Sequence, residues 1–517
     1  MARRESRRIL PDDSGDLLMT ALVPRVVDWL MKRWRKEPAV RRYSGAEQSD
    51  LLMDWVVGGL TANQELRGDI RLLRNRARDL GKNEATTRQY LRLLRNNVIG
   101  PDGIKMQARC RFSNGNLKKP LNDQIETAWK LWCKRPTIDG RGSLISLENL
   151  LIRTVAQDGE CFVLQHEGFN NPHAYALEAI DAALVDHELI RSARDGENAI
   201  ELGIERDPFG RRVAYWLKPT PTDRVRRRID ASRMLHIYVP EFVDQVRGAS
   251  WLNAAVKQLR HLDGYCEAEL VAARAGAAKL GIAKANDMFD PNVKQDDLKM
   301  RFRAGTLQLL PPGYELQDWS PDHPNDGFPN FTKSVLRQTA CALGVSYNAL
   351  ANDLEGVNYS SMRSGLLIER DEWRVLQTWW IDEFLQPVYE AWLRSALFVG
   401  AITGVPAQSP TPDMYAVKWR PRGWAWVDPL KDTNASILAI NNALASREEV
   451  IAETGGDFEE VLEQLAEEQG MLDEAGIEVP APASGGSANV ADAAAATDAA
   501  AQDEANRYQS NVGRLLQ

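Results

Sequence analysis

Histidine, cysteine and acidic side chains could supply catalysis or bind a metal, but in this sequence they form no complete motif. His166-Glu167 and His187-Glu188 each match the start of a zinc-protease HExxH motif, and neither has the second histidine. The phosphate-binding sequence GxxxxGK[ST], a GxGxxG sequence after a strand and the nucleophile sequence GxSxG are also absent. We therefore expect a protein that is not an enzyme, with no catalytic residue, metal or cofactor.

The cysteines favour neither a disulfide framework nor a zinc site. They are odd in number, widely spaced and without a CxxC pair, which is typical of a protein kept in a reducing cytoplasm. They are Cys110, Cys133, Cys161, Cys266 and Cys341. Met1 leads into the basic stretch ARRESRR rather than an apolar signal sequence, and no run of 18 apolar residues occurs. We expect no membrane partner.

Charge is distributed unevenly along the 517 residues. The length suggests roughly three domains, and a hydrophobic content of 44% is enough to fold most of the chain. The formal net charge is −8, but residues 428–517 hold 18 acidic and 4 basic residues, so this region alone carries −14. The remainder is net +6. The overall acidity argues against a protein that simply coats nucleic acid.

The most informative stretch is residues 334–399. A helix is predicted to end near Gly344, and a polar, turn-rich loop follows from Val345 to about Ser360. A long amphipathic helix comes next and holds four of the 15 tryptophans, which at helical spacing most often lie in a core. They are Trp373, Trp379, Trp380 and Trp392. A polar loop between two strong helices, without catalytic groups, predicts a mechanical or binding role.

Upstream of this stretch, helices give way to strands. Residues 21–42 mix apolar and basic residues at helical spacing, which fits a solvated surface helix better than a membrane-surface or acidic-partner helix. Residues 49–62 and the arginine-rich region from Glu65 predict two helices, closed by the turn Gly100-Pro101-Asp102-Gly103. After a helix over 147–156, the runs CFVLQH, AYALEAID, AIELGIERD, RRVAYWLKP and MLHIYV predict a β-rich module of hairpins.

Residues 249–281 have apolar residues every three or four positions and predict a helix about 50 Å long. Strands are predicted over 306–310 and 314–318 around Pro311-Pro312-Gly313, and a helix over 328–343. Strands are expected again at 415–421 and 424–427. Ser446 with Glu449 forms a capping-box signature, and Asp457 should open a helix that Gly470 closes. The small and polar residues from about Val479 onward predict disorder.

Several of these segments resemble lambda-type phage portal proteins. The segments are RARDLGKN with RLLRNNVIGPDGIKMQ, Asp158-Gly159-Glu160, Gly203-Ile204-Glu205 through Tyr215-Trp216, His236-Ile237-Tyr238 with Pro240-Glu241, Leu343-Gly344-Val345-Ser346-Tyr347, Gly356-Val357-Asn358-Tyr359-Ser360-Ser361, Arg370-Asp371 with Gln377, and Pro387-Val388-Tyr389. They occur in the family's order, and the resemblance covers roughly residues 65–470.

The resemblance implies an α+β portal fold assembled as a ring, with a β-rich and helical wing, a two-helix stem, a small α/β clip, a long kinked helix and a helical crown. The implied regions are a basic arm (1–48), wing (49–248), first stem helix (249–281), clip (282–327), second stem helix (328–344), tunnel loop (345–361), long helix with wing strands (362–427), acidic crown (428–478) and disordered tail (479–517).

The resemblance also implies a function and partners. The ring would be a homododecamer at one capsid vertex of the virion, assembled in the host cytoplasm, through which double-stranded DNA is packaged and ejected without sequence-specific contacts. Its partners would be the terminase large subunit, the major capsid protein and a head–tail adaptor protein. The implied channel residues are Asn348, Asn352, Asp353, Glu355, Asn358 and Tyr359, and the implied motor-docking residues of the clip are Arg301, Arg303, Tyr314 and Glu315.

Two other readings remain. A DNA-processing enzyme or ring translocase would need a phosphate-binding loop or a carboxylate–metal cluster, and the sequence has neither motif. A non-portal capsid or scaffold protein would need no motif at all, and images of the purified chain would distinguish it from a ring with an axial hole.

Overall fold

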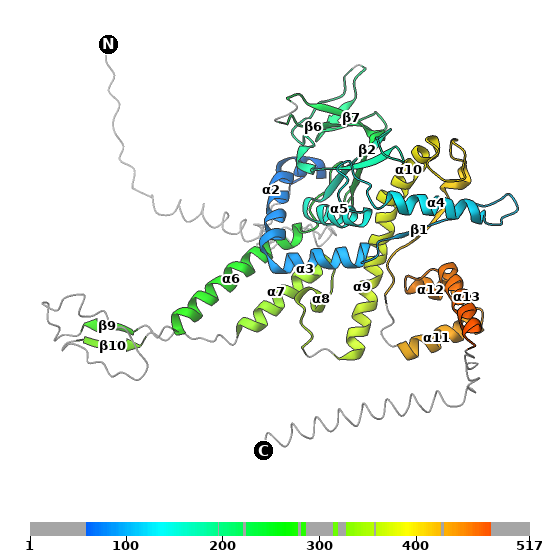
Figure 1. Ribbon diagram of the computed structural model, residues 1–517. Helices are drawn as coiled ribbons and strands as arrows, with labels where there is room; N and C mark the ends of the chain where they lie inside the picture. Colours follow the sequence, from blue (N-terminus) through cyan, green and yellow to red (C-terminus); the bar gives the residue numbers. More distant parts are fainter. Residues whose placement is uncertain are drawn as a thin grey trace, which may run out of the picture. The chain divides into compact units, whose positions relative to one another are not determined.

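The computed structural model describes residues 58–194, 196–220, 224–277, 281–285, 314–318, 327–355, 358–424 and 429–476. The chain divides into two compact units, Met1–Thr61 and Ala62–Gln517, and the second contains nearly all of the described residues. It combines helices with antiparallel sheets, in agreement with the predicted α+β class (Figure 1). The predicted basic arm and the disordered tail lie outside the described residues.

The arginine-rich region forms two helices, α2 (Ala62–Asn83) and α3 (Ala85–Leu94), followed by a π-helical turn, η3 (Arg95–Ile99). The carboxylate of Glu84 separates the two helices by accepting hydrogen bonds from the amides of Thr86 and Thr87. Of the helix predicted over 49–62, residues 49–57 lie outside the described residues, and 58–61 are not helical. Ala62 belongs to α2, so the second helix begins three residues earlier than predicted.

The β-rich module contains two antiparallel sheets, as the sequence predicted. Its elements are α4 (Lys119–Trp132), α5 (Leu144–Asp158), β2 (Glu160–Glu167), β3 (Tyr175–Ile180), β4 (Ala199–Glu201), β5 (Ile204–Arg206), β6 (Arg212–Leu217), β7 (Arg227–Asp230) and β8 (Met234–Tyr238). One sheet has the order β3-β2-β8 and the other β4-β5-β6-β7. A third ribbon pairs β1 (Lys105–Ala108) with β11 (Val417–Arg420). The sequence analysis did not identify α4 or β7.

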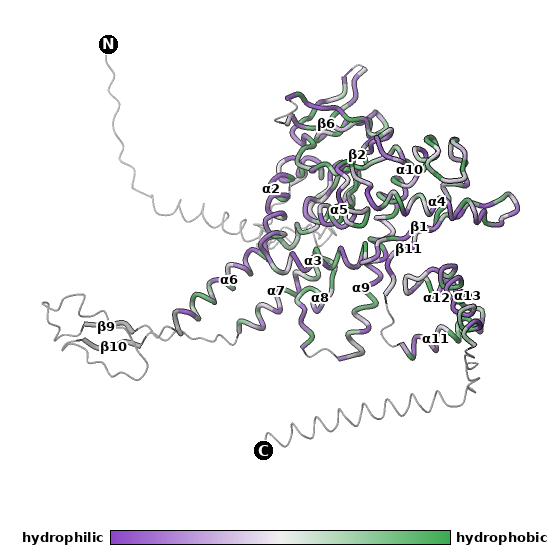
Figure 2. The backbone as a smooth tube through the Cα atoms, viewed as in Figure 1, coloured by the Kyte–Doolittle hydropathy of each residue, from purple (hydrophilic) through white to green (hydrophobic). Residues whose placement is uncertain are grey.

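The helix predicted over 249–281 is shorter than expected. The observed α6 (Asn253–Ala277) starts after Ser250, whose hydroxyl accepts the amide of Leu252. Gly281 already belongs to β9 (Gly281–Ala285), which pairs with β10 (Tyr314–Asp318). The predicted strand over 306–310 lies outside the described residues, and the described partner of β10 is β9. Polar and apolar residues are interspersed along α6 (Figure 2). This helix packs against α7 (Gly327–Leu343), which agrees with the helix predicted over 328–343.

The tryptophan-rich helix is three segments in a row, α9 (Tyr359–Trp380), the π-helical η7 (Ile381–Leu385) and α10 (Gln386–Phe398). Trp380 and Trp392 are fully buried, and Trp392 lies 5.0 Å, between ring centres, from Trp129 of α4. These rings therefore form the core of the molecule, which confirms the structural interpretation of the tryptophans.

The acidic region is helical, with α11 (Pro429–Asn441), α12 (Arg447–Glu453) and α13 (Phe458–Ala475). The predicted capping box is present, since Ser446 and Glu449 each accept the other's backbone amide. Asp457 caps α13 as predicted, but Gly470 does not end it. The helix continues through good helix formers to Gly476, whose φ of 65° terminates it. Of the predicted strand over 424–427, Trp424 is not in a strand and the rest lies outside the described residues.

A buried charge network joins the first sheet to the helices around it. The Glu160 carboxylate is fully buried and accepts hydrogen bonds from Arg247 Nε at 2.8 Å, Arg74 at 2.9 Å and His236 Nε2 at 3.0 Å. Burial alone would raise the pKa of Glu160, but Arg247 and His236 outweigh it and hold that pKa well below its usual range. Burial lowers the pKa of His236 to about 4, so this imidazole is neutral near pH 7.

Replacing Glu160 with glutamine should destabilise the fold strongly. The substitution leaves the buried guanidinium of Arg247 without a counter-charge, which costs about 3–5 kcal/mol. Thermal and urea unfolding of Glu160→Gln measure this loss. Asp371→Asn is the matched control, because it breaks an exposed pair with Arg374 and should change stability little. Equal unfolding midpoints for the two variants would contradict the role assigned to Glu160.

A second buried carboxyl, Glu148 of α5, should make the stability of the fold decrease as the pH rises from about 4.5 to about 8. Its oxygen accepts Trp380 Nε1 at 3.1 Å, and burial raises its pKa to about 8. The stabilising contribution of the neutral carboxyl is complete below the unfolded value near 4.5 and is lost as pH rises through about 8. Relative to Glu148→Gln, the unfolding free energy of the parent chain should fall by at most about 5 kcal/mol between about pH 5 and about pH 9. Parallel urea titrations of both proteins test this, and identical pH profiles would refute it.

Candidate functional site

The segment predicted as a tunnel loop is partly helical, which corrects the expectation of a continuous loop. Gly344, at a φ of 66°, ends α7. The Val345 amide donates a hydrogen bond to the Ala340 carbonyl at 3.1 Å and so caps the end of this helix. Ser346 then caps a short helix, α8 (Tyr347–Ala351), by accepting the Ala349 amide. The irregular parts of the predicted loop within the described residues are therefore 345–346, 352–355 and 358.

The helix α8 is attached to the body of the molecule at two points. Leu350 is 2% exposed, and Gln89 of α3 donates to the Ala349 carbonyl at 3.1 Å. These contacts were not predictable from periodicity, because five residues give too short a pattern. They leave 352–355 as the projecting part of the segment.

Lys333 of α7 binds both acidic side chains of the predicted loop. Its ammonium lies 2.7 Å from Glu355 Oε2 and 3.5 Å from Asp353 Oδ2. Asp353 also accepts the Tyr347 hydroxyl at 2.7 Å and the Glu355 amide at 2.9 Å. The guanidinium of Arg337 in turn lies over the face of the Tyr347 ring, 5.3 Å from the centre of that ring. The loop thus folds back onto α7 through a small polar cluster.

This cluster changes the electrostatics expected for the loop. The Tyr347 hydroxyl, the Glu355 amide and the charge of Lys333 lower the pKa of Asp353, which stays ionised. The hydrogen bond to Glu355 raises the pKa of Lys333, which stays cationic. One lysine therefore offsets one of the two carboxylate charges. The implied channel residues include no lysine or arginine, and Lys333 was not among them because it lies 20 positions upstream of Asp353 on another helix.

The remaining predicted residues are placed as follows. Asn348 lies half-buried within α8, Asn352 ends that helix with a φ of 52°, and the Asn358 carbonyl accepts the Met362 amide as α9 begins. Tyr359 is the first residue of α9. The structure brings together Asp353 and Glu355 through Lys333.

The residues predicted for motor docking are only partly described. Tyr314 and Glu315 are the first two residues of β10, opposite Ala285 and Lys284 of β9. Arg301 and Arg303 lie outside the described residues.

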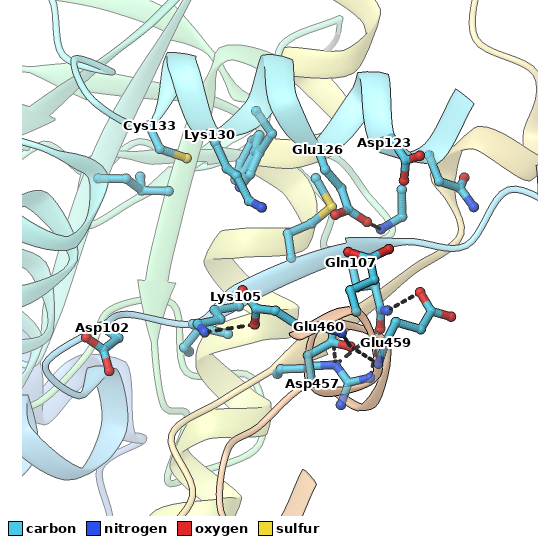
Figure 3. A pocket seen from close by; sticks show the side chains of 18 of the residues that line it. Asp102, Lys105, Gln107, Asp123, Glu126, Lys130, Cys133, Asp457, Glu459 and Glu460 are labelled. Atoms are coloured by element: carbon cyan, nitrogen blue, oxygen red, sulfur yellow. Dashed lines mark hydrogen bonds and ion pairs between the residues drawn. The ribbon is translucent and has the colours of Figure 1, made fainter. Parts of the chain in front are cut away.

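Charge also joins the acidic helices to the β1–β11 ribbon, beside a hollow of about 410 Å³ between α4, β1 and α13. Arg420 of β11 lies 3.0 Å from Asp457, and Arg109 lies 3.3 Å from Glu459. Lys105 lies 3.5 Å from Glu460 (Figure 3). None of α11, α12 and α13 has a buried residue, and the three ion pairs hold α13. The α12 residue Glu448 lies 2.5 Å from Lys418, and the α11 residue Asp432 lies 2.8 Å from Arg363. The opposite charges of the two segments were visible in the sequence, but their pairing was not.

Within the part of the chain that the structure describes, neither a group of side chains suited to a metal ion nor a helix long and apolar enough to cross a membrane is found.

Comparisons with known sequences agree on one family. The family model described as "Phage portal protein, lambda family" matches residues 48–377. The chain is 33% identical over 467 residues to the "Probable portal protein" of Halomonas phage phiHAP-1, an alignment that covers 86% of this chain and 90% of that protein. It is 22% identical over 322 residues to "Portal protein B" of Escherichia phage lambda, covering 54% and 60%. A solved structure, "Neck of empty GTA particle computed with C6 symmetry", aligns with 14% identity and a TM-score of 0.44 over 75% of this chain and 93% of that one.

Removing Lys333 should loosen the segment 346–355 without unfolding the protein. In Lys333→Gln both carboxylates lose their cation, so backbone amides 352–355 should exchange hydrogen faster. The global unfolding midpoint should stay unchanged, because exposed ion pairs contribute little to stability. Lys257→Gln, an exposed lysine of α6 without a described ion pair, is the control. Exchange equal to that control would show that Lys333 does not hold the segment.

Proposed function

Because the chain belongs to the lambda family of phage portal proteins, it is a structural component of the capsid and not an enzyme, and we propose that twelve copies close into a ring around a DNA channel. The ring would occupy one vertex of the virion, and double-stranded DNA would enter and leave through it. Family membership excludes the two alternatives of a DNA-processing enzyme and a non-portal scaffold protein.

Exposed apolar side chains on the two predicted stem helices support ring closure. Leu270 and Val271 of α6 are 53% and 57% exposed, and Phe331 of α7 is 52% exposed although it lies against Tyr265 of α6. Large apolar side chains that gather on neighbouring helices favour burial against another subunit. We propose that the neighbouring subunit of the ring covers them.

The single observation that best supports a channel role is the Lys333 cluster. Polar contacts with Lys333 hold residues 352–355, which we call the tip. The buried side chain of Leu350 anchors the preceding residues. We propose that this tip lines the narrow part of the channel. Strong cationic contacts to phosphate would hold a sliding duplex, whereas a nearly neutral polar surface lets it pass. Asn348, Asn352, Asp353, Glu355, Asn358 and Tyr359 remain the proposed channel residues.

Other regions are proposed to contact protein partners. The clip over 282–327, with Arg301, Arg303, Tyr314 and Glu315, would dock the terminase large subunit during packaging and the head–tail adaptor protein later. The wing would contact the major capsid protein. The acidic crown over 428–478 would face the capsid interior, where its negative charge repels phosphate and keeps DNA from adhering. Assembly would take place in the host cytoplasm.

Deleting residues 352–355 should separate channel function from assembly. Shortening a surface loop changes closure entropy only slightly, so rings and procapsids should still form. Packaged DNA should fall, or leak from filled particles, as measured by nuclease-protected DNA per particle. A length-matched variant with glycine and serine at 352–355 separates the loss of length from the loss of side chains. If the deletion abolished the ring in negative-stain images, the segment would be an assembly element and the channel assignment would be wrong.

A further inference from the structure

A braced turn between β8 and α6 presents apolar side chains to solvent. Val243 is fully exposed and Phe242 is 61% exposed. The turn is nonetheless rigid, because the Gln245 side-chain oxygen accepts the amides of Glu241 at 2.8 Å and Phe242 at 3.1 Å. We call Glu241, Phe242 and Val243 the knob. A rigid mount for exposed apolar groups is typical of a contact site.

The base of the knob is held just as firmly. Asn63 of α2 donates to the Asp244 carbonyl and accepts the Val246 amide, both at 2.9 Å. Asp244 itself adopts a φ of 65°, a conformation that few residues other than glycine take, and its carboxylate is bonded to Arg206. Such bracing is not needed for a loop that only connects a strand to a helix.

A hollow of about 470 Å³ elsewhere on the chain has a largely apolar lining. Ile138, Leu147, Leu150 and Leu177 supply its apolar side chains, and we call these four residues the socket. Leu150 is 54% exposed and Ile138 37% exposed, so the socket is open to solvent.

The knob and the socket lie at opposite ends of α5. The socket is formed against the first two turns of this helix. At the other end the Ala156 carbonyl accepts the Trp251 amide at 3.1 Å, and Gly159 touches the Ala249 backbone, only a few residues after the knob. The 15 residues of α5 span about 22 Å. In Figure 1, α5 lies between α2 and α4.

The two surfaces also differ in charge. The knob is acidic through Glu241, and the socket is bordered by exposed Arg141, with Lys134 and Arg135 on the preceding turn. These three cations have no ion pair within the described residues. Two carboxylates also line the hollow. Asp139 accepts the Thr137 hydroxyl at 2.6 Å and the Arg141 amide at 3.1 Å, and Glu178 lies 2.8 Å from His166. The three cations outnumber these two carboxylates, so the border of the socket keeps a positive balance.

We propose that the knob of one copy of this chain inserts into the socket of the next copy, with Glu241 against Arg141. The proposal rests on the ring proposed above and names one of its subunit contacts. A ring needs two different, complementary surfaces on each subunit, whereas a twofold dimer uses one self-complementary surface. Two such surfaces separated along one rigid helix meet that requirement, and α5 then runs along the circumference of the ring.

Disulfide trapping tests the contact directly. Val243→Cys and Leu150→Cys are combined in the full-length chain, and assembled particles are oxidised and run on a non-reducing denaturing gel. A ladder of covalent multimers beyond the dimer is expected, because each subunit offers one cysteine to each neighbour. Each single-cysteine variant is a control for the five native cysteines and should match the parent chain. If assembled particles of the double variant give the same gel bands as the parent chain, the proposed contact is wrong.

Charge reversal provides an independent measurement. Glu241→Arg should shift the mass distribution measured by mass photometry toward monomer, and adding Arg141→Glu should restore assembly. Both side chains are exposed, so unchanged circular dichroism and melting should accompany the shift. If both single reversals assemble like the parent chain, the contact is wrong and the ring stands. If the parent chain itself stays monomeric at every concentration and salt, the proposed ring fails as well.

Discussion

The fold depends on a carboxylate that has no access to water. Glu160 is fully buried, and so is Arg247, its principal partner, whose remaining donors reach the carbonyls of Leu202 at 2.8 Å and Ala182 at 3.3 Å. A buried ion is tolerated only when its charge and hydrogen-bonding capacity are satisfied, so these groups must meet in one arrangement. That arrangement joins α2, both sheets and the segment that leads into α6.

The same network fixes how the long helix leaves the β-rich module. Gly248 follows Arg247, donates its amide to Glu160 at 3.1 Å and lies so close to Gly159 that a Cβ there would be 2.0 Å from the Gly159 oxygen. Gly159 adopts a φ of 88° at the end of α5. Two glycines and one ion pair thus bring the end of α5 against the start of α6. A force applied to α6 would therefore pass into the sheets through a rigid, polar joint rather than through a flexible linker.

The sequence predicted those parts that rest on local rules. Gly344, the Ser446–Glu449 capping box, the helix over 328–343 and the short strands of the β-rich module all follow from periodicity and end signals. It failed where a distant contact overrides a local signal. The helix α8 forms inside a polar stretch because Leu350 is buried. Gly470 is a different case, because its neighbours in the sequence favour a helix strongly enough to continue α13 through the glycine. The channel assignment of the segment 345–361 stays a prediction, and Lys333 could be found only once α7 and the loop were seen together.

Two kinds of attachment coexist in this chain, and the difference bears on function. The β-rich module and the tryptophan-rich helix are held by a large apolar cluster around Trp129, Trp380 and Trp392, which charge screening by salt does not weaken. The acidic helices and the 352–355 tip are held chiefly by ion pairs and hydrogen bonds, which salt and polyanions weaken. The elements proposed to meet DNA are therefore the ones whose attachment an approaching phosphate backbone can alter. If the 352–355 tip meets DNA as proposed, a phosphate near Lys333 would compete with Asp353 and Glu355 for one cation, and the tip would yield while its anchor on Leu350 stays in place.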